Sequence, residues 1–383
     1  MLVLVQILRA VAALMVVWHH GRHEAGLLAA RGAGPGFAPE TLLPWWAGVD
    51  LFFVISGFVI VHASRSLAGA PGGRRRFLAH RIARVVPLYW LTSLAYLALA
   101  LAAPGLLGEA GALARDPAFV AASFLFWPMA RPDGSVQPLY GLGWTLNAEM
   151  FFYALFALGL GFGLRGAVAW LGVVLLALAA TGTLLPLPLP LAFWADPVVL
   201  EFLLGAGLGL ARTSGLRAPG GMRLALAGLG LLGFLFAGRL LAGAEEVPGL
   251  ARPLLAGLPA LALVAAAAIG PERGTAGVAP LPNPLPWPLR ALSRLGDASY
   301  ALYLVHPFAL RAGREALLRL GLAPRLPLWG SLLAMTLLAV VAAILVHRLV
   351  ERPLTRTLRA WLASRENRVG SRAPPVFTGT EDR

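Results

Sequence analysis

Residues 326–347 read LPLWGSLLAMTLLAVVAAILVH, a run that contains no Asp, Glu, Lys or Arg. Two further runs of this kind occupy residues 85–108 and 166–195. Each meets the length of roughly 20 residues that an α-helix needs to cross the hydrocarbon core of a bilayer. A soluble fold could not keep several such segments from water, so the sequence predicts an integral membrane protein.

The composition agrees, with 58% hydrophobic and 13% charged residues and a mean hydropathy of +0.74. Soluble domains hold roughly 45–50% apolar and about 25% charged residues. The net charge of +14 does not indicate a nucleic-acid partner, because the arginines cluster between apolar segments. Arginines at such places typically set topology and contact lipid headgroups. Cysteine is absent, which excludes disulfides and thiol catalysis.

Ten apolar segments predict an all-α, polytopic transmembrane helix bundle of about ten spans. The loops that would share a side with the N-terminus hold most of the arginines, which predicts cytoplasmic termini. Residues 1–360 are expected to form this membrane domain, followed by a disordered cytoplasmic tail at 361–383. The segments lie near residues 5–20, 45–63, 85–103, 143–164, 167–186, 198–211, 224–242, 254–270, 296–316 and 327–347.

Ionisable residues at membrane depth are costly and therefore mark candidate sites. Arg9 and His20 are eleven residues apart, close to three helical turns, so both side chains lie on one face about 16 Å apart along the axis. Such a stripe could hold the two ends of a long ligand. Alternatively, Arg9 reaches the inner headgroups and His20 lies at the outer interface.

Two other segments carry charge near that helix. Asp50 opens the second segment from the side expected to hold His20, and a nearby carboxylate can fix the tautomer of a histidine. A helix-capping role is the alternative for Asp50. Arg81 and Arg84 are three residues apart and share a helix face, and their guanidinium groups suit phosphates.

The fourth and ninth segments supply further candidates. Glu149 and Tyr153 are one turn apart at the start of a predicted span, where a carboxylate is expensive to bury. His306 falls near the middle of another span, and a structural histidine is as consistent with that position as a functional one.

Taken together and in this order, these pieces resemble the acyltransferase-3 family of membrane O-acyltransferases. The resemblance covers roughly residues 1–355. It rests on Arg9-x10-His20, the run Gly48–Phe58, Arg81-x-x-Arg84 before Pro-Leu-Tyr-Trp, Trp144–Tyr153, Ser299–His306 and Glu351-Arg352-Pro353.

The resemblance implies transfer of an acyl group, often acetyl, from cytoplasmic acyl-CoA to a carbohydrate or glycolipid hydroxyl outside the cytoplasm. Some members of the family instead modify macrolide-type secondary metabolites. It implies a multi-pass protein of the bacterial inner membrane, surrounded by lipid, with no permanently bound cofactor and no metal. His20 would be catalytic, oriented by Asp50 or Glu149. Arg9, Arg81 and Arg84 would bind the donor, and the substrate-binding candidates are Trp144, Tyr153 and His306.

The chain departs from the family pattern in two ways. The usual Trp-Ser-Leu-Ser-Val-Glu-Glu-Gln-Phe-Tyr run appears as WTLNAEMFFY at residues 144–153, which retains only the first glutamate. Many relatives also carry a soluble esterase-like domain after the membrane part. We therefore expect transfer to be completed within the membrane part, or with a separate periplasmic transferase or a second copy of the chain.

A transporter or flippase of a glycan or lipid-linked substrate is the competing class. It would also explain many helices and intramembrane charges. Against it, the sequence has no repeated pair of Gly/Pro-broken spans, and the Arg9–His20 stripe has no particular use in transport.

Overall fold

The computed structural model describes residues 2–31, 43–103, 110–242, 247, 249–271 and 286–370. All regular structure in these residues is helical. Leu and Ala favour helices, and a helix pairs the backbone N–H and C=O groups of a segment within lipid. The α-helices are α1 (Val3–Ala29), α2 (Gly48–Ala63), α3 (Gly73–Ala102), α4 (Ala110–Leu113), α5 (Pro117–Phe124), α6 (Trp144–Gly159), α7 (Gly163–Leu184), α8 (Leu191–Trp194), α9 (Leu200–Thr213), α10 (Gly220–Leu240), α11 (Leu258–Ala268), α12 (Trp287–Asp297), α13 (Ser299–Arg319), α14 (Leu328–Val346) and α15 (Arg352–Gly370).

The prediction of an all-α membrane bundle is confirmed, and each of the ten predicted segments overlaps a helix. Among the described residues, six helical stretches are long and apolar enough to cross a membrane, while the count of ten spans and the cytoplasmic termini stay predictions. The six stretches are Val3–Ala29, Trp45–Ala63, Gly73–Ala102, Gly141–Leu184, Gly220–Leu240 and Leu328–Arg365.

Two helices extend beyond the boundaries that hydropathy suggested. α3 begins at Gly73, twelve residues before the predicted span, so Arg81 and Arg84 lie on one continuous helix with that span. α15 continues to Gly370, so the chain is still helical well into the segment predicted as a tail. The remainder of that segment, 371–383, lies outside the described residues.

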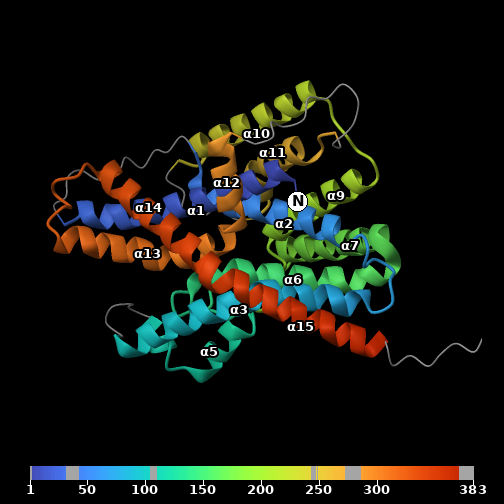
Figure 1. Cartoon of the computed structure of the whole chain (residues 1–383), viewed down its shortest axis with the longest axis horizontal. Coiled ribbons are helices and arrows are strands. Elements are labelled where there is room, and N and C mark those ends of the chain that lie inside the picture. The colour runs from blue at the N-terminus through green and yellow to red at the C-terminus, as the bar shows by residue number, and fades with distance from the viewer. Residues whose placement is uncertain are drawn as a thin grey trace, which may run out of the picture.

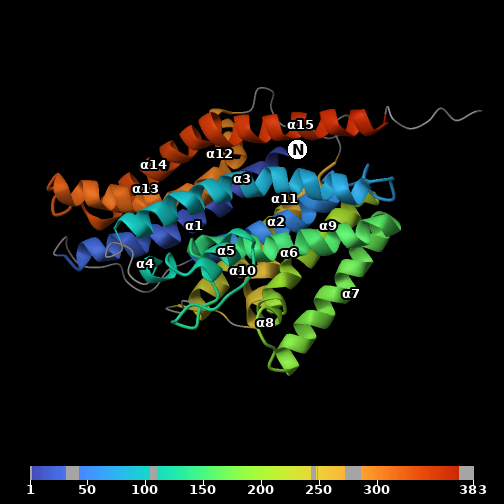
Figure 2. The ribbon, with the colours of Figure 1, turned by 90° about the horizontal axis from the view of Figure 1, so that it is seen from below.

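The helices form two groups along the longest axis of the molecule (Figure 1). α1, α13 and α14 pack together at one end, while α2, α6, α7 and α9 form the other. α3 and α15 lie side by side, and α14 and α15 run on from one another along one edge (Figure 2). α1 contacts α2, α12, α13 and α14, so it is the helix around which the others are arranged.

The start of α2 lies halfway along α1 rather than at its outer end. A Cβ atom on Gly48 would meet the Ala12 carbonyl oxygen at 2.5 Å and the side chains of Met15 and Val16 at 2.9 and 3.0 Å. Glycine therefore permits the close approach that sets this level. Asp50, the third residue of α2, consequently lies deeper in the bundle than the sequence suggested.

Glycines also hold α2 against α9. Gly57 of α2 contacts the backbone of Phe202, and Gly205 of α9 contacts the carbonyl of Val54. Gly209 repeats the contact one turn later, where a Cβ would lie 2.9 Å from the carbonyl oxygen of Phe58. This is a small-xxx-small interface, in which missing side chains let two backbones touch.

Because a Cβ at position 205 would overlap backbone atoms of α2, Gly205→Ala is expected to destabilise the protein by about 1–3 kcal/mol, as overpacking does. Gly207→Ala is the matched control, since nothing lies within 4 Å of its added Cβ. Thermal unfolding of the two variants in detergent compares them directly. Equal melting temperatures would show that the α2–α9 contact is looser than described.

Candidate functional site

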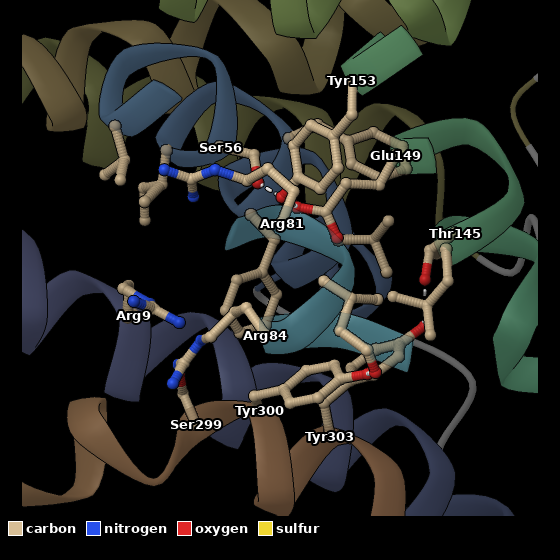
Figure 3. Close-up of a pocket in the computed structure, with 17 residues that line it drawn as sticks. Arg9, Ser56, Arg81, Arg84, Thr145, Glu149, Tyr153, Ser299, Tyr300 and Tyr303 are labelled. Atoms are coloured by element: carbon tan, nitrogen blue, oxygen red, sulfur yellow. Dashed lines mark hydrogen bonds between the residues drawn. The ribbon is translucent and has the colours of Figure 1, made fainter. Parts of the chain in front are cut away.

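Three adjoining cavities run through the bundle. The central cavity, with a volume of about 120 Å³, lies between α1, α2, α3, α6 and α13 (Figure 3). A second, the basic cavity, shares the lining residues Arg9, Val59, Arg81 and Arg84 with it. A third, the histidine cavity, contains His20 and shares Val49 and Tyr303 with the central one. The central cavity thus lies between the other two.

Hydrogen-bonding side chains from α2, α6 and α13 line the central cavity. Glu149 accepts hydrogen bonds from Ser56 and Tyr153, and all three cluster on one side in Figure 3. On another side, the hydroxyls of Thr145 and Tyr303 lie 2.8 Å apart. The cavity therefore combines an apolar wall with a few fixed polar groups, as small-molecule sites commonly do.

Three arginines stand where the central and basic cavities meet. Arg9 comes from α1 and Arg81 and Arg84 from α3, and Figure 3 shows the guanidinium groups of Arg9 and Arg84 approaching each other. The guanidinium of Arg81 lies 5.8 Å from the centre of the Tyr153 ring. Like charges this close repel unless an anion lies among them. The three residues predicted to bind the donor are therefore together, and their role stays a prediction.

The basic cavity is lined mainly by arginines. The side chain of Arg84 is fixed by an ion pair with Glu351, 3.1 Å away, and His347 lies 2.7 Å from the same carboxylate. The arginines of the lining come from α1, α3, α12 and the region from the end of α14 into α15; they are Arg9, Arg81, Arg84, Arg294, Arg348, Arg352 and Arg359.

His20 and His23 of α1 line the histidine cavity, and the ring of His20 packs against His306 of α13. Their ring centres are 5.2 Å apart. His306 is fully buried, and its Nδ1 lies 3.1 Å from the carbonyl oxygen of Leu302. Because a carbonyl oxygen only accepts, Nδ1 donates this hydrogen bond, which leaves Nε2 as the acceptor nitrogen of the neutral ring. Aromatic and charged side chains complete the cavity, among them Tyr96, Tyr140, Trp144, Phe308, Arg131, Arg311, Arg314, Glu24 and Glu315.

Arg9 and His20 both face the interior of the bundle, as their spacing predicts. They line two adjoining cavities rather than one, with Arg9 in the central and basic cavities and His20 in the histidine cavity. Val16, seven residues after Arg9, lines the histidine cavity from the same face of α1. One face of α1 therefore passes along the whole series of cavities.

Asp50 pairs with Arg252 and not with His20 as expected. Both oxygens of the fully buried Asp50 accept from Arg252, at 2.8 and 3.1 Å. The reason is the level of α2, which begins beside Ala12–Val16 and carries Asp50 away from His20. The Arg252 guanidinium lies 5.6 Å from the ring of Trp46 and 5.6 Å from that of Trp144. Asp50 thus contributes to the position of Trp144, which lines the histidine cavity.

Glu149, the other carboxylate considered for orienting His20, belongs to the central cavity together with Tyr153. Its hydrogen bond from Tyr153 and the stacking of Arg81 on that ring connect it to the arginine side. The imidazoles near His20 are those of its chain neighbour His19, with ring centres 5.1 Å apart, and of His306 on α13, while His23 lines the histidine cavity.

Four residues of this arrangement were not singled out by the sequence analysis. Ser56 and Tyr303 lie inside segments that the sequence analysis noted. Tyr303 could have been found from its spacing, because it lies three residues before His306 and so shares its helix face. Glu351 lies in a noted tripeptide, but its pairing with Arg84 joins residues far apart in the chain. A lone Arg252 before a short apolar segment gave no signal.

Comparison with known proteins identifies the family of the chain. The family model described as "Acyltransferase domain" matches residues 4–348. The chain is 33% identical over 316 residues to "Exopolysaccharide production protein ExoZ" of Rhizobium meliloti (strain 1021), covering 82% of this chain and 90% of that protein.

A second relative is "Acyltransferase MdmB" of Streptomyces mycarofaciens, 30% identical over 342 residues, with 81% of each chain covered. No solved structure gives a significant match. The family match over most of the chain and these two relatives favour an enzyme over a transporter or flippase. The chain belongs to the acyltransferase-3 family of multi-pass membrane acyltransferases.

Proposed function

We propose that this acyltransferase moves an acyl group, most simply acetyl, from cytoplasmic acyl-CoA to a hydroxyl of a carbohydrate outside the cytoplasm or linked to the membrane. The observation that carries the proposal is the order of the cavities. An arginine-lined cavity leads to a central cavity with fixed hydroxyls, which adjoins a cavity lined by His20. That order matches a donor whose phosphates and thioester lie at opposite ends.

The donor would bind with its phosphates near Arg9, Arg81 and Arg84. Guanidinium groups bind phosphate through paired, charge-assisted hydrogen bonds. The pantetheine arm would then extend through the central cavity, where Thr145 and Tyr303 offer hydroxyls. In this arrangement the thioester reaches the boundary formed by Val49 and Tyr303, beside the histidine cavity.

His20 is the proposed base. Its imidazole takes the proton of an acceptor hydroxyl as the oxygen attacks the thioester carbonyl, forming a C–O bond. The C–S bond breaks, and the thiolate of CoA takes the proton back from the imidazolium, which leaves ester and CoA. In the alternative route the imidazole nitrogen attacks the thioester carbonyl, the C–S bond breaks, and CoA leaves with the ring proton. The acceptor hydroxyl then attacks the acyl-imidazole, the C–N bond breaks, and the hydroxyl proton returns to the ring. Both routes require His20.

The acceptor would enter the histidine cavity. Its aromatic side chains offer faces for the apolar sides of sugar rings, and the charged groups of its lining, including the Glu24–Arg314 pair at 2.6 Å, offer hydrogen bonds. The printed name of the Rhizobium relative refers to exopolysaccharide production, which supports a carbohydrate acceptor. We place the protein in the bacterial inner membrane, where acyl-CoA is available on the cytoplasmic side.

Replacing His20 with alanine is expected to lower acyl transfer by about 10²–10⁴-fold, the usual contribution of a general base, while CoA binding is unchanged. The measurement is transfer of radiolabelled acetyl from acetyl-CoA to the glycolipid and polysaccharide fraction of inverted membrane vesicles. His80→Ala, on α3 and outside the three cavity linings, should transfer normally. Wild-type transfer by the His20 variant would refute the proposal.

The Asp50–Arg252 pair gives a second test. Removing one partner of a buried ion pair costs about 3–5 kcal/mol, so Asp50→Asn and Arg252→Gln are each expected to lower thermal stability and activity. In the double variant two neutral amides can hydrogen-bond, and both properties should largely recover. If stability recovered while acyl transfer stayed lost, Asp50 would act on the chemistry itself rather than through the position of Trp144.

A further inference from the structure

Four arginines line the basic cavity without reaching the central one. They are Arg294 at the end of α12, Arg348 after α14, and Arg352 and Arg359 of α15. We propose that this outer arginine cluster binds the 3′-phosphate on the ribose of the acyl-CoA donor. The inference rests on the proposed function and adds the C-terminal helix to the donor site.

Three of the four arginines of the cluster lie on one face of a continuous helix. Arg348, Arg352 and Arg359 are spaced by four and seven residues, which places them one and two turns apart on the same side. The π-helical turn His347–Glu351 joins α14 to α15, and such turns are frequent at functional sites because they re-aim the following side chains.

Glu351 fixes this helix against the inner arginines. Its side chain is 1% exposed, and its carboxylate lies 3.1 Å from Arg84 and 2.7 Å from His347. α15 also packs along α3, the helix that carries Arg81 and Arg84. The two sets of arginines are therefore held at a fixed separation rather than on independent loops.

The positive charge of the basic cavity favours a ligand with several negative charges. Seven arginines line it, and the carboxylate in the same lining is that of Asp297, whose Oδ1 accepts a hydrogen bond from Gln6. Arg294, Arg348, Arg352 and Arg359 are exposed, so the wall is open to a soluble ligand. Repulsion among these guanidinium groups falls when phosphates lie between them.

Acyl-CoA carries phosphate in two places, and the cavity offers two sets of arginines. The diphosphate adjoins the pantetheine arm, so it fits the set shared with the central cavity, Arg9, Arg81 and Arg84. The 3′-phosphate lies at the other end of the nucleotide and fits the outer cluster. Arg352 and Arg359 follow residue 348, where the match to the family model ends.

A phosphate can also come from a lipid headgroup, and exposed arginines on a helix suit both sources. The two sources of phosphate predict different effects on the binding of the donor. Only a site for the 3′-phosphate makes binding depend on whether the soluble nucleotide carries that group.

The test compares CoA with dephospho-CoA, the same molecule without the 3′-phosphate. Full-length protein in nanodiscs of neutral phosphatidylcholine is titrated with each, and the two Kd values are measured. The wild type should bind CoA at least about tenfold more tightly, as expected for charge-assisted hydrogen bonds. The double variant R352A/R359A should lose most of this preference and bind dephospho-CoA as the wild type does.

The matched control is R356A/R365A, which removes the same charge from the same helix at positions outside the cavity lining. It should keep the preference. An unchanged preference in R352A/R359A, in neutral nanodiscs and in nanodiscs with anionic phosphatidylglycerol, would assign these arginines to lipid and overturn the proposal. So would a wild type that binds both nucleotides equally. A wild type that binds neither would overturn the proposed donor as well.

Discussion

A guanidinium and an imidazole on one face of an apolar helix can be kept in a membrane only where the surrounding helices leave a polar space in front of them. α1 meets this constraint over three turns, from Arg9 to His20. The rest of the architecture follows from it. α2, α3, α6 and α13 leave the central cavity open beside Arg9, and α13 brings His306 to His20.

The glycine contacts decide where along α1 the other groups lie. Because Gly48 lies against Ala12–Val16, α2 places Ser56 near the arginines and Asp50 beside Arg252. The close α2–α9 contact at Gly57 and Gly205 then keeps α2 at that level. The chemistry at the two ends of the passage thus depends on glycines, whose missing side chains let neighbouring helices come close.

Periodicity and charge predicted the helices, the shared face of Arg9 and His20, and the grouping of Arg81 with Arg84, because each is a property of one segment. The partner of Asp50 could not be predicted in this way, since it depends on how far α2 slides along α1. The roles of Arg252 and Glu351 could not be predicted for the same reason, because their partners lie on helices distant in the sequence. The helix was not predicted to continue to Gly370, because hydropathy detects only segments that contact lipid. α15 is a polar helix that packs on α3.

The central claim is that the thiol end of CoA reaches the boundary between the central and histidine cavities. The chain has no cysteine, so Val49→Cys places a single thiol at that boundary, and Val11→Cys places one on an exposed position of α1. Each variant is incubated with CoA under mild oxidation by diamide and analysed by mass spectrometry of the intact protein. The account predicts a mixed disulfide with CoA on the Val49 variant and almost none on the Val11 variant. No capture at position 49, or equal capture at both positions, would contradict it.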